Sequence, residues 1–136
     1  IAATDNDAYN TLVATDLASE FGRENVFQLS RETSDSERYA LPPKLCGRAI
    51  GAVETFWEVQ RRMWDGWEFR ATSLSDEFTL QDWYDTHPDG IPIADIGPRG
   101  TLRILGPDDA PKETEGSRLV AMLPKKPHRA KAEGQA

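Results

Sequence analysis

Residues 1–29 read IAATDNDAYNTLVATDLASEFGRENVFQL, and this stretch decides the fold class. Its apolar start runs into Asp5, Asn6 and Asp7, side chains that accept hydrogen bonds from the free N–H groups of a helix start. Apolar residues then recur at helical spacing, and Gly22 suits a left-handed C-terminal cap, which predicts a helix with one apolar face. These residues are Tyr9, Leu12, Val13, Leu17 and Phe21. Residues 25–29 read as a buried strand, so strand, helix and strand within about 30 residues predict a βαβ unit of a parallel sheet.

The rest of the chain predicts a small strand-rich domain. A polar stretch followed by Pro42 and Pro43 predicts a linker over residues 30–43, and residues 44–124 then form the second domain. Helices are expected over residues 54–65 and 80–86, the latter capped by Thr79 and Asp82. Strands are expected over residues 67–74, 91–96, 101–105 and 118–123. The predicted fold class is therefore α/β (α+β), with the C-terminal part of a Rossmann-like βαβ unit at residues 1–29 followed by a small α+β domain.

The chain is acidic overall but basic at its end. The formal net charge is −7, whereas residues 125–136 carry Lys125, Lys126, Arg129 and Lys131 against one acid, Glu133. An acidic body repels a phosphate backbone, so we expect no nucleic-acid partner. The basic tail at residues 125–136 is expected to be disordered. The alternative is contact with anionic lipid headgroups, worth about 1 kcal/mol per positive charge.

Three further features bound the class of protein. No apolar run approaches the roughly 20 residues that cross a bilayer. The chain opens at Ile1 on residues that already read as the interior of an element, from which we expect further sequence upstream. Cys46 is the single cysteine, which excludes an internal disulfide and suits a reducing compartment, and we expect it to be a structural or incidental thiol.

Residues that could carry catalysis follow no recognisable pattern, so we expect no enzyme. His87 and His128 lie in no nucleophile motif. Asp76, Glu77 and Asp82 lack the alternating spacing of a calcium loop and are expected to form a solvated acidic surface without a metal.

The start of the first helix allows two interpretations. Asp5 and Asp7 either cap and charge the first helical turn, or they line a ligand crevice, because ligands of open α/β sheets bind beyond the carboxyl ends of the strands. The glycine-rich phosphate loop GxGxxG is absent from the sequence. We therefore expect no nucleotide to bind to this chain alone.

Tryptophan is the other conspicuous residue type. The chain holds Trp57, Trp64, Trp67 and Trp83. Aromatic residues at helical spacing usually belong to a core, and exposed ones would instead indicate a protein interface.

Two stretches resemble a known family. Residues 1–29 are similar to the later half of the RCK-type (regulator of K⁺ conductance, TrkA-like) domain. Residues 69–83, FRATSLSDEFTLQDW, together with IPIA at 91–94 and RLVAMLP at 118–124, resemble the extreme C-terminal domain of bacterial sodium/proton antiporters that carry such a domain. The order of the motifs, with EFGR preceding LSDEFT, adds to the resemblance.

The resemblance implies a soluble regulatory region on the cytoplasmic side of the cell membrane, attached to the transmembrane part of a monovalent cation:proton antiporter. It also implies a homodimer through the regulatory domains and, in the intact parent, a nucleotide of the NAD or AMP/ATP type. Of the family's ligand-facing positions, Thr4 and Asp5 carry over to this chain. We expect a ligand or ion to change domain packing and thereby transport. The alternative is a stand-alone interaction module that dimerises through the helix bearing Trp57 and Trp64, and a small-molecule enzyme is the third possibility.

Overall fold

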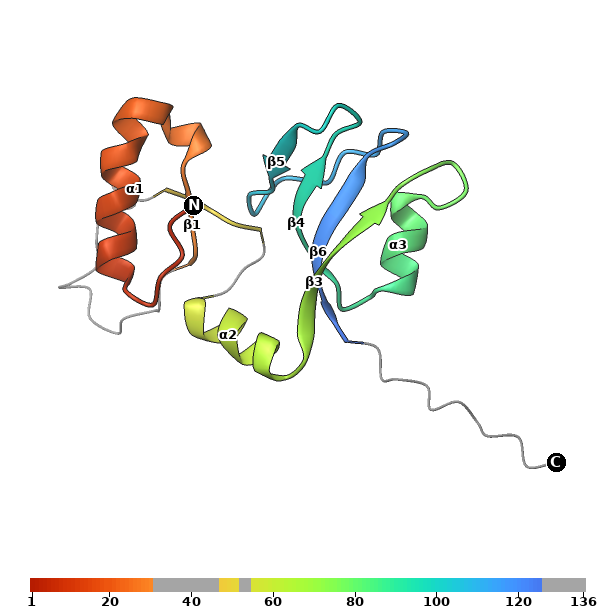
Figure 1. Cartoon of the computed structure of the whole chain (residues 1–136), viewed down its shortest axis with the longest axis horizontal. Coiled ribbons are helices and arrows are strands. Elements are labelled where there is room, and N and C mark those ends of the chain that lie inside the picture. The colour runs from red at the N-terminus through yellow and green to blue at the C-terminus, as the bar shows by residue number, and fades with distance from the viewer. Residues whose placement is uncertain (31–46, 52–54, 126–136) are drawn as a thin grey trace.

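The computed structural model describes residues 1–30, 47–51 and 55–125, and these form two lobes (Figure 1). We call residues 1–30 and 47–51 the first lobe and residues 55–125 the second lobe. The predicted mixed α+β class is confirmed, because helices accompany both a small parallel sheet and a four-stranded antiparallel sheet. No helix within the described residues is long and apolar enough to cross a membrane.

The first lobe is a helix packed on a short parallel sheet. Helix α1 spans Asp7–Phe21 and is followed by the 3₁₀ turn η1 at Arg23–Asn25, strand β1 at Phe27–Gln28 and strand β2 at Arg48–Ala49. Ala2 forms a parallel bridge with Gln28, and β1 pairs in parallel with β2. Helix α1 and the parallel strand β1 thus follow in the predicted order, while the predicted first strand is represented by the isolated bridge at Ala2.

The predicted apolar face of α1 is wrong. The side chains that α1 buries are Asn10, Thr11 and Ala14, whereas Tyr9 and Leu12 are 55% and 68% exposed. Phe21, also assigned to that face, is exposed as well. The reason is the close approach of the helix to the sheet, since a Cβ added at Gly47 would lie 3.3 Å from the Cβ of Ala14. Small residues allow this contact, and bulky side chains are excluded from it.

The start of α1 follows the predicted capping, whereas Gly22 at its end has the expected positive φ but a ψ of 141°, outside the predicted left-handed conformation. Asn6, between the two acids, is the N-cap, and its Oδ1 accepts a hydrogen bond of 2.9 Å from the N–H of Tyr9. Gly22 ends the helix at φ 81°, a backbone angle that favours glycine, and its N–H donates to the carbonyl of Ala18.

Some residues that the sequence assigned to the second domain belong to the first lobe in the structure. Strand β2 pairs with β1 in the register Phe27 with Arg48 and Gln28 with Ala49. Apart from Ser30, the expected linker at residues 30–43 lies outside the described residues. Cys46 and the tail beyond Lys125 also lie outside them.

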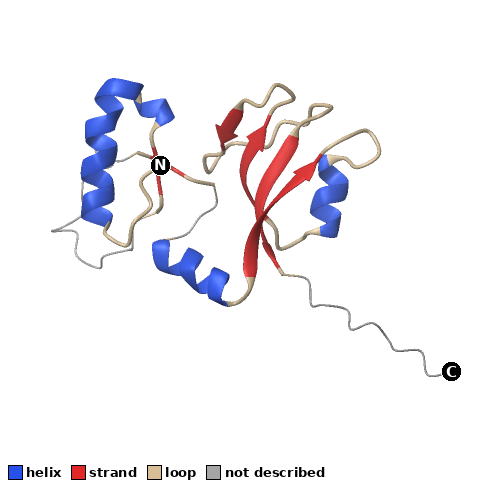
Figure 2. Ribbon diagram, in the orientation of Figure 1, coloured by secondary structure: helices blue, strands red, loops and turns tan. Residues whose placement is uncertain are grey.

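The second lobe is built on an antiparallel sheet with strand order β3-β6-β4-β5. Its elements are α2 (Phe56–Trp64), β3 (Trp67–Ser73), α3 (Leu80–Thr86), β4 (Ile91–Ile96), β5 (Leu102–Ile104) and β6 (Arg118–Pro124). Figure 2 shows α3 on one side of this sheet and α2, with the first lobe, on the other. The helices and strands expected from sequence in this lobe are confirmed, with α3 at the predicted residues.

Alternation along the central strand β6 gives the sheet two apolar faces. Leu119, Ala121 and Leu123 join Trp83 of α3 in the core of the lobe. Met122, between them, points to the opposite face. Since that face is turned toward α2 and the first lobe, the sheet also contributes side chains to the space between the lobes.

Candidate functional site

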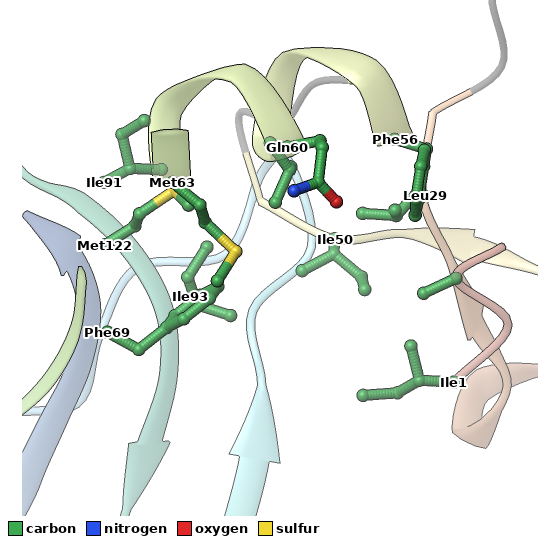
Figure 3. A pocket seen from close by; sticks show the side chains of 12 residues that line it. Ile1, Leu29, Ile50, Phe56, Gln60, Met63, Phe69, Ile91, Ile93 and Met122 are labelled. Carbon is green, nitrogen blue, oxygen red and sulfur yellow. The ribbon is translucent and has the colours of Figure 1, made fainter. Parts of the chain in front are cut away.

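An apolar cavity of about 310 Å³ lies between the two lobes (Figure 3). Both lobes and helix α2 supply its walls. Cavities at the junction of two lobes are the usual place for a small-molecule site, and their common volumes begin near 300 Å³. The cavity is therefore our candidate functional site.

The first lobe contributes the face of its parallel sheet that is turned away from α1. In parallel strands, residues paired in register point to the same side, and successive residues alternate. Gln28 is buried on the side of α1, so its neighbour Leu29 points to the opposite side. Ile1, Ala3 and Ile50 line the cavity from the same face.

Helix α2 contributes one face. Phe56, Val59, Gln60 and Met63 line the cavity and follow the spacing i, i+3, i+4, i+7, which places them along one side of a helix. The helix starts at Thr55 with a capping box, in which the Thr55 N–H donates to Glu58 Oε2 at 3.0 Å. This cap fixes the first turn of the helix above the cavity.

The antiparallel sheet closes the remaining side. Met122 of β6 pairs with Phe69 of β3 and with Ile91 of β4, so these three side chains stand on one face of the sheet. Ile93 of β4 joins them in the lining. Gln60 is then the polar side chain among lining residues that are otherwise apolar. The cavity is open to solvent at Ile1, Met63 and Phe69, which are 72%, 48% and 51% exposed, so it would cover a bound molecule in part, and its lining offers an amide for one polar contact.

Two polar contacts join the lobes beside the cavity. The N–H of Gly51 donates to the carbonyl of Leu105 at 2.6 Å. Arg48 of β2 forms an ion pair of 3.0 Å with Asp109, and both side chains are about a third exposed or more. The pKa of Asp109 lies below its usual value, chiefly because the carboxylate accepts a hydrogen bond from the Gly106 N–H and also because Arg48 is positively charged. An ion pair this exposed contributes only about 0–1 kcal/mol, so it guides the packing of the lobes without locking it.

Thr4 and Asp5, the predicted ligand-facing residues, lie outside the cavity lining, between the Ala2 bridge and α1. Asn10 holds Thr4 from both sides: its Oδ1 accepts from the Thr4 N–H at 3.0 Å and from the Thr4 hydroxyl at 2.7 Å. Its Nδ2 donates to the Thr4 carbonyl at 2.9 Å. Asp5 is exposed. The polar groups of Thr4 are thus already used, and sequence reasoning missed Asn10, the residue that uses them.

The other polar candidates have structural contacts. Asp82 Oδ2 accepts from both the N–H and the hydroxyl of Thr79, and these bonds lower the pKa of Asp82. The His87 ring stacks on Trp83 with centroids 5.3 Å apart. Across residues 1–30, 47–51 and 55–125 there is no group of three or more His, Cys, Asp or Glu side chains that could hold a metal ion. His128 lies outside the described residues.

Comparison of the chain with protein-family models, with curated proteins and with solved structures found no match. Function is therefore inferred from the residues and from the geometry around the cavity.

Proposed function

We propose that this chain is a regulatory segment of a monovalent cation:proton antiporter and lies on the cytoplasmic side of the membrane. In this function, a ligand or ion changes how the two lobes pack, and the change shifts the transporter between its states. The motif resemblance of residues 1–29, 69–83, 91–94 and 118–124 supports the choice of transporter class.

The observation that carries the proposal is the cavity between the lobes. Each lobe has its own sheet, and in the part of the chain that the structure describes the lobes meet around a cavity of about 310 Å³ with two polar contacts beside it. Interfaces of this kind allow domains to move relative to each other. Regulation by a change in lobe packing uses this property directly.

The first lobe also presents surfaces suited to a neighbour. The Ala2 segment bonds to β1 on one edge, and within the described residues no other segment pairs with its second edge. Tyr9 and Leu12 of α1 are more than half exposed on the side away from the sheet. Exposed apolar surface beside a sheet edge supports a larger assembly, either with further α/β structure of the parent or with a second copy in a homodimer.

A nucleotide of the parent is not expected to be held by this chain alone. The hydroxyl and N–H of Thr4 bond to Asn10, which leaves Asp5 as the exposed member of the predicted pair. A carboxylate repels phosphate, and no glycine-rich turn is present in the sequence to offset that repulsion. These residues do not fit a nucleotide site on their own.

Removal of the second lobe tests the regulatory function. Deleting residues 55–136 from the intact antiporter should change the pH or cation dependence of transport while the membrane part still folds and transports. Transport is measured in everted vesicles as a function of pH and of Na⁺ or K⁺ concentration. The parent with the surface substitution Arg61→Ala serves as the control and should keep the original dependence, since Arg61 is exposed and lies outside the cavity lining.

An unchanged pH and cation dependence after the deletion would contradict the regulatory function. The alternative, a dimerisation module, is favoured by the exposure of Trp57 and Trp64 on α2, at 52% and 73%. Sedimentation equilibrium identifies it, because a dimer that forms through these side chains dissociates when both are replaced by alanine.

A further inference from the structure

We infer that the cavity between the lobes binds an uncharged, largely hydrocarbon molecule of about two fused rings that carries one hydrogen-bonding group. This inference rests on the proposed regulatory function and names the kind of ligand to which it responds. The size, the charge and the single polar contact of the cavity each define one property of the ligand.

The volume sets the size of the ligand. The cavity measures about 310 Å³. An apolar protein cavity of about 150 Å³ stays dry and takes up benzene, so twice that volume matches two fused rings or an alkyl chain of similar size. A larger polycyclic molecule would extend beyond the cavity into solvent near the exposed side chains of Ile1, Met63 and Phe69.

The lining sets the charge of the ligand. All of the side chains that form it are uncharged, and all but Gln60 are apolar. Burial of an unpaired carboxylate or ammonium group in such surroundings is strongly unfavourable. The ion pair of Arg48 with Asp109 joins the lobes, but neither residue belongs to the lining, so it offers no charge to a molecule in the cavity.

Gln60 sets the polar contact. Its amide has no hydrogen-bond partner among the described residues, although it lines a cavity of apolar side chains, and Figure 3 shows it on α2 above Ile50. An amide both donates and accepts, so a hydroxyl or carbonyl group of the ligand can pair with it. Such a pair would orient the ligand relative to α2.

A molecule in this position contacts both lobes at once. Ile1, Leu29 and Ile50 would touch it from the first lobe, and Val59 and Met122 from the second. Because the site exists only while the lobes are packed in this way, binding stabilises this arrangement over any in which they separate. Ligand binding is thereby coupled to lobe packing.

Binding of 2-naphthol to the full 136-residue chain tests the inference. This probe has two fused rings and one hydroxyl group, and it is uncharged at neutral pH. We expect a Kd of about 0.1–1 mM for a ligand of this size. Methyl ¹H–¹³C NMR spectra should show shifts at Ile50, Met63 and Ile93, which line the cavity. When the α-amino group of Ile1, a lining residue, is acetylated, the anion 2-naphthoate should bind at least about tenfold more weakly, because no positive charge then lies beside its carboxylate.

Two variants and a matched control locate the binding. Gln60→Leu should weaken 2-naphthol binding by about fivefold, the value of one net hydrogen bond. The filled pair, Ala3→Phe with Val59→Trp, places larger side chains in the lining and should abolish binding. The control pair, Ala8→Phe with Arg61→Trp, adds the same residues at exposed positions outside the lining and should bind as the original chain does.

Absence of methyl shifts with 2-naphthol would overturn the inference, as would equal binding of 2-naphthoate to the acetylated chain or unchanged binding by the filled pair. If the spectrum of the filled pair shows that this variant does not fold, the Gln60→Leu variant is used in its place. An unchanged Kd of Gln60→Leu for 2-naphthol would then overturn the inference. These measurements use no transporter. A failure here together with altered transport after deletion of residues 55–136 would reject the ligand class and leave the regulatory function standing.

Discussion

Replacement of Trp83 by alanine should reduce the free energy of unfolding by about 3–5 kcal/mol, the largest loss that we expect from a single substitution in this chain. Trp83 is 0% exposed and lies at the centre of the second lobe, packed with Leu74, Leu119 and Leu123. Its ring also forms an edge contact with Tyr84 at 5.2 Å between centroids. The expected loss is close to the whole free energy of unfolding of the least stable domains, which is about 5 kcal/mol.

Urea denaturation of the full chain, followed by far-UV circular dichroism, measures the loss. Trp64→Ala is the matched control because it removes the same side chain from α2, where it is 73% exposed. Its effect should stay within about 0.5 kcal/mol. Equal losses for the two variants would show that the core of the second lobe is not where the structure places it.

Replacement of Asn10 by alanine should reduce the free energy of unfolding by about 2–4 kcal/mol. Asn10 is 1% exposed and makes three hydrogen bonds to Thr4, two to backbone groups and one to the hydroxyl. Alanine leaves the Thr4 N–H and carbonyl without these partners in a partly buried position, and an unsatisfied buried polar group costs about 1–3 kcal/mol. The end of the first parallel strand should then loosen.

Amide hydrogen exchange distinguishes this local effect from general loss of stability. The N–H groups of Ala2 and Leu29, which hold the Ala2 segment to β1, should exchange faster in Asn10→Ala at a urea concentration where the second lobe remains folded. Asn25→Ala provides the control, because Asn25 is exposed and its amide donates only to the Phe21 carbonyl. Equal exchange in both variants would argue against the positioning of Thr4 by Asn10.

Elements with strong local signals could be predicted from the sequence. Thr79 and Asp82 form a capping box, and this interaction lies entirely within the first turn, so α3 was predicted at its observed residues. The hairpin of β4 and β5 follows from glycine and proline between two apolar runs. Such signals need no knowledge of the rest of the chain.

Features that depend on distant contacts could not be predicted in the same way. The large side chains of α1 suggested its buried face, but the close approach of Gly47 to Ala14 selects a face of small residues. The return of β2 to the first lobe is a parallel pairing between residues some 20 positions apart, and no local pattern specifies it. The cavity likewise draws its lining from both lobes.

The candidate site was located only in part by sequence. A helix was expected over residues 54–65, and Phe56, Val59, Gln60 and Met63 on one side of it line the cavity. Thr4 and Asp5 came from the resemblance, whereas the bonds of Asn10 to Thr4 required the structure. The one signal that could have identified Asn10 is its place as a polar residue among the apolar residues of the first helical turns.

Transport by the antiporter that we propose as the parent of this chain, carrying the filled pair, Ala3→Phe with Val59→Trp, tests the central claim most directly. Nothing is deleted, and the membrane part is untouched, so the substitutions act through the packing of the two lobes across the cavity. We predict a shift in the pH or cation dependence of transport relative to the control pair, Ala8→Phe with Arg61→Trp. Identical dependence in the two pairs, with both proteins folded and present in equal amounts, would contradict the claim that packing across this cavity regulates transport.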